Sequence, residues 1–121
     1  MLPRASRMRS ASEFRRTIRS GVRAGRSSVV VSAYRADPQA DGVRVGFVVS
    51  KAVGNAVTRN RVKRRLRHLC RPLVEPTPQG TWVVVRALPP AADAGPELAD
   101  DLAGAWRTCL KRLAQRTGVT A

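Results

Sequence analysis

The sequence predicts a single α+β domain, in which a small mixed sheet packs against helices in the order αββαβα. The length of 121 residues fits one domain with one modest core. Hydrophobic residues make up 43% of the chain, which is enough for a folded core. Runs of β-branched residues alternate with segments of helical spacing, and no repeat is visible. We expect a flexible basic arm at 1–10, the domain at 11–117 and a tail at 118–121.

The first predicted element is a short helix that starts at Ser12, a good N-cap residue. Phe14, Ile18 and Val22 recur at intervals of four residues and form one apolar stripe. Gly21 limits this helix to about two turns. Because so short a helix is marginal on its own, we expect it to dock on the rest of the domain.

Two strands are predicted next, at 27–35 and 43–50, because both segments are rich in β-branched residues. In the second strand, every other residue from 43 to 49 is apolar, so one face is fully apolar: Val43, Val45, Phe47 and Val49. The link at 37–42 contains Pro, Gly and two Asp, which favour turns. We therefore expect an antiparallel hairpin.

A long helix is predicted from about 56 to 71, with Asn55 as its N-cap and Pro72 as its end. One side of it is apolar: Val62, Leu66, Leu69, Cys70 and Leu73. A third strand follows at 81–88, a loop at 89–97, and a last helix from about 98 to 115, with Gly118 beyond its end.

The chain is strongly basic, with 23 Lys and Arg against 8 Asp and Glu, and its pI is near 11.8. Residues 1–71 carry the whole net charge of +15, since residues 72–121 hold five of each sign. Such a balance indicates a polyanionic partner, with nucleic acid first and an anionic membrane or acidic protein as the other candidates.

The charge is densest in "GNAVTRNRVKRRLRH", residues 54–68, which holds six Arg or Lys and no acid. On a helix, Asn60, Arg64, Arg67 and Arg71 form one outward stripe, flanked by Arg61 and His68, with Lys63 nearer the core side. The ordinary alternative is a solvated helix face, but that predicts mixed signs, because like charges one turn apart repel. We therefore expect this side to bind phosphates, mainly through Arg.

The sequence lacks the residues that other classes of function require. No Walker loop, GxSxG or HExxH motif is present, and we expect the single His, His68, to face RNA or solvent rather than to act as a base. Cys70 and Cys109 lack the pairing of a zinc site and are predicted to be reduced core thiols. No apolar run is long enough to span a membrane, and the N-terminus does not resemble a secretory signal, so we expect a cytoplasmic protein.

Residues 43–68 resemble the signature of the bacterial ribonuclease P protein subunit. In that family a strand ends in S-K and is followed by G-N-A-V-x-R-N-R-x-K-R-x-x-R. Every residue is present here: Ser50, Lys51, Gly54, Asn55, Ala56, Val57, Arg59, Asn60, Arg61, Lys63, Arg64 and Arg67. The basic start with Arg7 and Arg9, and Phe14 seven residues before Gly21, also fit, so the resemblance covers about residues 6–115.

The resemblance implies a protein that assembles with a catalytic RNA to form ribonuclease P, which removes the 5′ leader of precursor tRNA. The RNA and Mg²⁺, bound mainly by the RNA, hydrolyse the phosphodiester bond, so no catalytic or metal-binding residue is expected in the protein. The protein raises affinity for the precursor. The family fold also has a left-handed βαβ crossover, against the usual rule.

Carried over by position, the catalytic RNA would contact Lys51, Asn55, Arg59, Asn60, Arg61, Lys63, Arg64, Arg67, His68 and Arg71. The leader would lie in a cleft with Phe14, Ile18, Ser32 and Tyr34, although Phe14 equally fits plain core packing. Ile18 and Ala52 stand where the family often has an aromatic residue and a Lys. Tyr34 lies two residues beyond the usual aromatic position, which Ser32 occupies.

Three other readings remain. A general or ribosome-associated RNA-binding protein would bind structured RNA without helping the catalytic RNA to cleave. A DNA-binding or membrane-surface protein is the second, although a membrane helix needs its apolar side for lipid, and here that side is needed to cover the strands. A stand-alone nuclease lacks metal-binding carboxylates in the basic region.

Overall fold

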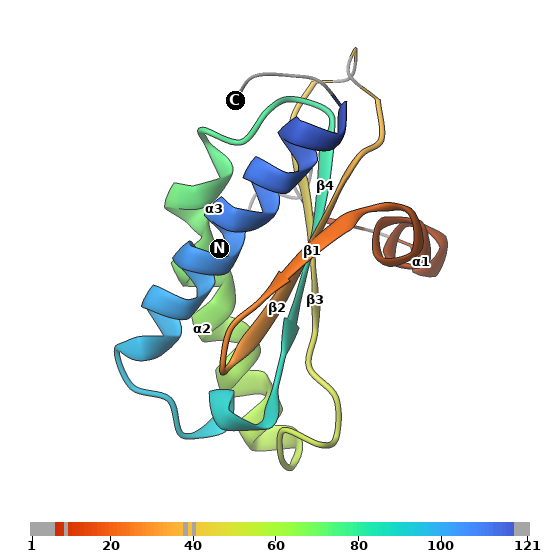
Figure 1. Ribbon diagram of the computed structural model, residues 1–121. Helices are drawn as coiled ribbons and strands as arrows, with labels where there is room; N and C mark the ends of the chain where they lie inside the picture. The colour runs from red at the N-terminus through yellow and green to blue at the C-terminus, as the bar shows by residue number, and fades with distance from the viewer. Residues whose placement is uncertain (1–6, 9, 38, 40, 118–121) are drawn as a thin grey trace.

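The sheet lies in the middle of the molecule, with two long helices on one face and one short helix on the other (Figure 1). The computed structural model describes residues 7–117 apart from 9, 38 and 40. Their elements are α1 (Ala11–Ser20), β1 (Val22–Gly25), β2 (Val29–Arg35), β3 (Arg44–Val48), α2 (Ala56–Val74), β4 (Thr81–Ala87), the 3₁₀ helix η2 (Pro89–Ala92) and α3 (Glu97–Thr117). The α+β class and the mixed sheet are confirmed.

The four described strands lie in the order β1-β2-β4-β3. β1 and β4 both pair antiparallel with β2, whereas β3 pairs parallel with β4. The predicted hairpin between 27–35 and 43–50 is therefore wrong, because β4 lies between those strands. Val83, Val84 and Val85 are all buried, on both faces of the sheet, which is what a central strand requires. The true hairpin joins β2 to β1, a four-residue strand that the predicted order αββαβα lacks.

The predicted start of α1 is also wrong by two residues. The N-cap is Ser10, whose hydroxyl accepts a hydrogen bond from the Glu13 backbone N–H at 3.2 Å. The same hydroxyl donates to the Glu13 carboxylate, so the two residues support each other at the helix start. Gly21 ends α1 as predicted, and a Cβ there would lie 2.2 Å from the Ala33 carbonyl oxygen.

Asn55 caps α2 as predicted, since its side chain accepts from the Thr58 backbone N–H at 2.9 Å. The helix does not end at Pro72, however, but continues to Val74. Proline removes one backbone hydrogen bond, and here it does so at an exposed position in the last turn. Partial burial of Leu73 and Val74 against the core offsets that loss.

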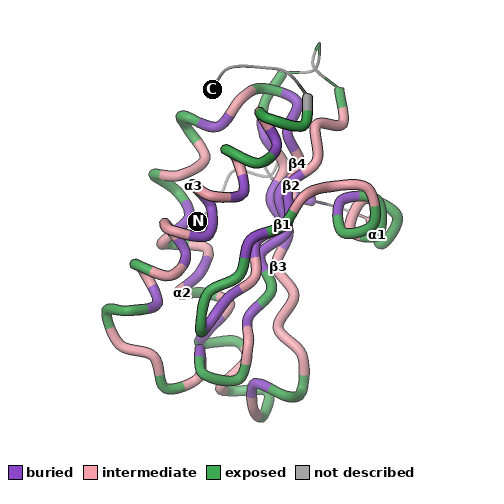
Figure 2. Tube along the Cα trace, in the orientation of Figure 1, coloured by how far each residue is buried: buried purple, intermediate pink, exposed green. Residues whose placement is uncertain are grey.

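The core lies between the sheet and the pair α2 and α3, where Figure 2 shows most of the buried segments. Leu66 from α2 and Leu98 and Leu102 from α3 are fully buried there. Cys70 and Cys109 are buried free thiols in the same core, as predicted. The outer side of α1, in contrast, is exposed (Figure 2).

Part of the expected N-terminal arm lies against the domain. The Met8 backbone N–H donates to the Val45 carbonyl at 3.0 Å, and Met8 is buried. Arg7 forms an isolated parallel bridge with Val45 at the edge of β3. The remaining arm residues 1–6 and 9, the tail at 118–121 and Gly118 lie outside the described residues.

Candidate functional site

The outward side of α2 carries the predicted stripe of Asn60, Arg64, Arg67 and Arg71. Together with the flanking His68 it is here called the α2 basic face. Four of these residues are exposed and Arg67 is half-buried. Within the described part of the chain, none of their side chains makes a hydrogen bond or ion pair. The helix contains no acid from 56 to 74. The face is thus a concentration of unneutralised donors directed at solvent.

A second group of α2 arginines is used inside the protein. Arg65 donates through both terminal nitrogens to the carbonyls of Ala94 and Gly95. Arg61 donates to the Ala92 carbonyl at 3.2 Å while remaining exposed. The two side chains thus hold the end of η2 and the segment that follows it against α2. Arg61, which the sequence assigned to RNA alone, therefore also has a contact within the fold.

The start of α2 combines structural and free groups. The Asn55 side-chain oxygen is occupied by its capping hydrogen bond, whereas Lys51 is exposed. Gly54 adopts φ +157, a conformation that side chains disfavour. Arg59 is half-buried, and its Nε has no partner among the described residues. A buried donor without a partner lowers the stability of the fold at this end of the helix.

Phe14 lines a cavity of about 100 Å³ at the edge strand β3, here called the Phe14 cavity. Its lining comes from four segments of the chain: Arg7, Met8, Phe14, Val45, Gly46, Phe47, Lys63 and Arg67. The Phe14 ring rests on Gly46, where a Cβ would lie 2.4 Å from Cζ of the ring. The structure thus brings a predicted leader residue together with two predicted RNA contacts. Phe14 is half-buried, so it packs and also borders the cavity.

The other three predicted leader residues lie apart from the Phe14 cavity lining. Ile18, one turn after Phe14 on the same side of α1, is 46% exposed. Ser32 is buried on the sheet face that α1 covers. Tyr34 lies two residues further along β2, and its ring meets Trp82 at a centroid distance of 6.4 Å. This face continues past α1 as a floor of Val30, Arg86 and Val48.

Sequence reasoning missed Trp82 and Arg44 on this face. Trp82 is paired with Tyr34 on one side and with Arg44 on the other, so the three residues form one row across the sheet. The Arg44 guanidinium carbon lies 5.9 Å from the Trp82 ring centroid. Strict alternation along "TWVVVRA" could have placed Trp82, Val84 and Arg86 on a common face.

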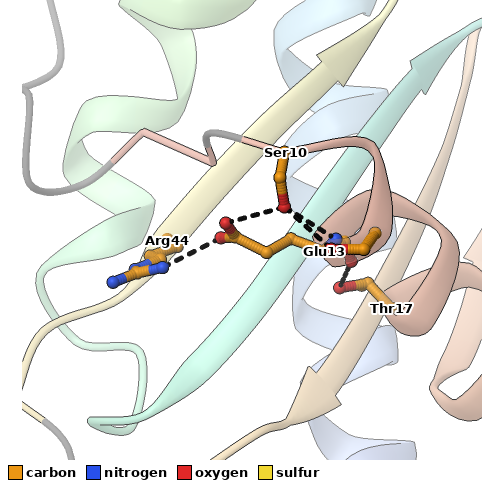
Figure 3. Close-up of polar contacts among 5 residues, drawn as sticks. Ser10, Glu13, Thr17 and Arg44 are labelled. Carbon is orange, nitrogen blue, oxygen red and sulfur yellow. Dashed lines mark hydrogen bonds and ion pairs between the residues drawn. The ribbon is translucent and has the colours of Figure 1, made fainter.

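Figure 3 shows how Arg44 and Glu13 connect the sheet to α1. The Arg44 guanidinium donates to the Glu13 carboxylate at 3.0 Å, which is the ion pair found within the described residues. The Glu13 carboxylate also accepts a hydrogen bond from the Ser10 hydroxyl, and its backbone carbonyl accepts one from the Thr17 hydroxyl. The one acid of α1 is therefore neutralised, and the remaining charges of this helix are positive.

The described residues contain no group of three His, Cys, Asp or Glu side chains placed to bind a metal ion. Burial raises the pKa of Cys70 to about 11 and that of Cys109 to about 12, so both thiols stay protonated at neutral pH. No helix in the described ranges is long and apolar enough to cross a membrane.

Comparison with known proteins gives relatives of the same family from sequence and from structure. The family model described as Ribonuclease P matches residues 2–113. A ribonuclease P protein component of Kocuria rhizophila is 56% identical, over 94% of this chain and 100% of its own length. One from a Nocardioides species is 54% identical, over 98% and 100%. The ribonuclease P protein of Staphylococcus aureus has a similar structure, with a TM-score of 0.70 and 26% identity, over 91% of this chain and 93% of that one.

Proposed function

Since the chain belongs to the bacterial family of ribonuclease P protein components, we propose that it acts by binding the catalytic RNA through α2 and the precursor's 5′ leader through the α1 side of the sheet. Membership makes it a component of the endoribonuclease ribonuclease P, with the ribonuclease P RNA as its partner and a role in tRNA 5′ leader processing. The residue assignments and the contact with precursor tRNA are proposals.

The α2 basic face is the observation that carries the assignment to the catalytic RNA. Its arginines have no partner in the described protein, and no acid on α2 offsets them. Arg presents a planar fork that matches phosphate oxygens, and counterion release on binding makes such a contact strongly favourable at low salt. Lys51, Asn55, Arg59 and Arg61 extend this surface around the start of α2.

The Phe14 cavity supports the assignment of the leader. Lys63 and Arg67 belong to α2, whereas Phe14 belongs to α1, and one cavity joins them. An unpaired strand can stack a base on an aromatic ring while its phosphates meet basic side chains. A leader on the floor beside α1 would therefore run from the cleavage site on the catalytic RNA past Phe14 and Ile18. Ser32 is too buried to contact it directly, and Tyr34 lies nearer Trp82.

We also propose that Mg²⁺ is held mainly by the RNA and that the RNA supplies the hydrolytic chemistry. The protein would then act by neutralising phosphates near the reactive bond and by holding the leader. A cytoplasmic location is part of the same proposal, and it is supported by the two unpaired cysteines.

The test is cleavage of precursor tRNA at low Mg²⁺ by three samples: the protein, a bacterial ribonuclease P RNA, and both together. We expect only the mixture to cut efficiently, at the mature 5′ end. A mixture no better than RNA alone, from a protein that still binds RNA, would instead support a general RNA-binding protein. Cutting by the protein alone would support a stand-alone nuclease.

A further inference from the structure

A second cavity lies on the opposite side of α1 from Phe14, and the proposed function makes no use of it. It measures about 370 Å³ and is here called the Trp82 cavity. Its lining consists of Trp82 from β4 and residues of α1: Ser12, Glu13, Arg15, Arg16, Arg19 and Ser20. The size is within the range of pockets that hold small organic ligands.

The Trp82 ring in this cavity is held in place by its neighbours. Tyr34 meets it edge to face at an interplanar angle of 65°, and Arg44 lies near the ring from the other strand. Arg44 is itself fixed by Glu13 of α1. The ring remains half-exposed and borders the cavity. A base that stacks on it would therefore lose little entropy through ordering the protein side chain.

The charge of the lining is positive. Glu13 is neutralised by Arg44, whereas the three arginines of the lining are exposed and make no ion pair with any described residue. Together they offer donors around the mouth of a cavity whose floor is an aromatic ring. An aromatic floor with arginines at its rim fits a nucleotide, because the base takes the ring and the phosphate takes the arginines.

We propose that the Trp82 cavity binds an unpaired nucleotide of the precursor's 5′ leader, with its base stacked on Trp82 and its phosphate on Arg16 and Arg19. This inference rests on the proposed function. α1 and α2 lie on opposite faces of the sheet (Figure 1), and the Trp82 cavity lies beside α1. The leader, which is proposed to bind on the α1 side, is therefore the nearer RNA. The Phe14 cavity and the Trp82 cavity lie on opposite sides of α1, so a leader that occupies both would cross this helix.

The experiment compares the reconstituted holoenzyme on two precursors that differ only in leader length. One leader ends within the Phe14 cavity, and the other is long enough to continue past α1. The variant Trp82→Leu removes the stacking ring but keeps an apolar side chain, and Trp82→Phe keeps a ring. We expect Trp82→Leu to weaken binding of the long-leader precursor about tenfold and to leave the short one unchanged, with Trp82→Phe close to wild type.

Two further measurements keep the test independent of folding. The double variant Arg16→Gln, Arg19→Gln changes only exposed side chains, so it should also weaken the long leader selectively. The long leader, added as a free oligoribonucleotide, should quench the fluorescence of Trp82. Trp82→Phe should show no such quenching, because the remaining tryptophan, Trp106, is 2% exposed. An equal effect of Trp82→Leu on both precursors, or no quenching, overturns the proposal.

Failure of the proposed function gives a different result. In that case wild-type protein would not help the catalytic RNA to cleave either precursor. If cleavage is normal but an acidic peptide quenches Trp82 and the leader does not, the cavity is a protein-binding site and the proposal is wrong.

Discussion

The two long helices α2 and α3 cover the same face of the sheet, yet their charges differ. α2 carries seven Arg and Lys and no acid, whereas α3 carries three acids and four bases. In α3 the acids lie near the start and the bases near the end, which suits the helix dipole. α2 lacks any acid in its first turn. Of the two helices, only α3 therefore has first-turn acids that stabilise it through the helix dipole.

The use of these charges differs in the same way. Asp101 of α3 accepts from both the backbone N–H and the hydroxyl of Ser28, and Arg112 donates to the Arg23 carbonyl at 2.6 Å. α2 commits Arg61 and Arg65 to the fold and leaves its outer face without a described partner. A count of charges alone does not separate these roles. The contacts of each guanidinium decide which arginines support the fold and which are available for RNA.

The largest expected effect is one that the two helices share. Leu66→Ala in α2 and Leu102→Ala in α3 each remove a fully buried side chain, so each should lower the free energy of unfolding by about 2–5 kcal/mol. Urea denaturation followed by circular dichroism measures this loss. A cost below about 1 kcal/mol for Leu66→Ala would mean that α2 is not part of the core in solution.

The next effect belongs to α3 alone. Asp101→Ala leaves the buried Ser28 N–H without an acceptor and should cost about 1–3 kcal/mol of unfolding free energy. RNA affinity, measured where both proteins are folded, should not change. Asp100→Ala at the exposed neighbouring position is the matched control and should be near neutral. A drop in RNA affinity for Asp101→Ala would show that α3 also binds RNA.

A smaller effect, on RNA affinity rather than on stability, should be seen in α2 and not in α3. Arg64→Gln removes one free cation from the α2 basic face, so affinity for ribonuclease P RNA should fall several-fold. The slope of log Kd against log salt should decrease by roughly one. Arg107→Gln removes an exposed charge from α3 and should change neither. Filter binding across a salt series measures both quantities. Equal effects of the two variants would mean that general positive charge, not the α2 basic face, binds the RNA.

The smallest expected effect is on stability at alkaline pH, and it should differ between the buried cysteines of α2 and α3. Burial raises the pKa of Cys70 and Cys109 above the ordinary 9.0, to about 11 and about 12. Stability is therefore unaffected by these groups below about pH 9 and falls as the pH rises toward their folded values, because the unfolded state loses its protons first. Cys109→Ala should reduce this alkaline loss more than Cys70→Ala does. Urea titrations between neutral and alkaline pH test the order, and the reverse order would contradict it.

The local features of the fold were largely predictable from the sequence. Asn55 as the cap of α2, Gly21 as the end of α1 and Leu66 as a core residue all depend on nearby chain positions, and all are confirmed. The errors at Ser12 and Pro72 are shifts of a few residues. Ser10 is the better cap because Glu13 stands three residues after it.

Strand order was not predictable in the same way, since it depends on pairing between distant segments. The turn chemistry at 37–42 favoured a hairpin, but the burial of Val83 to Val85 on both faces gives β4 the central place. The left-handed sense of the β3-α2-β4 crossover stays a prediction. In the site, the stripe on α2 followed from periodicity. The roles of Arg65 and Trp82 did not, because their partners are Ala94 and Tyr34, far away in the sequence.

The central place of β4 has a consequence for synthesis on the ribosome. β2 and β3 do not pair with each other, so the sheet cannot close until residue 87 has left the exit tunnel. The basic helix α2 is made before β4, at a stage when its apolar side has no complete surface to cover. A nascent chain in this state exposes both hydrophobic residues and a dense positive charge beside ribosomal RNA. The interval between the emergence of α2 and the emergence of β4 is therefore the stage of synthesis at which this chain is most prone to misfold or aggregate.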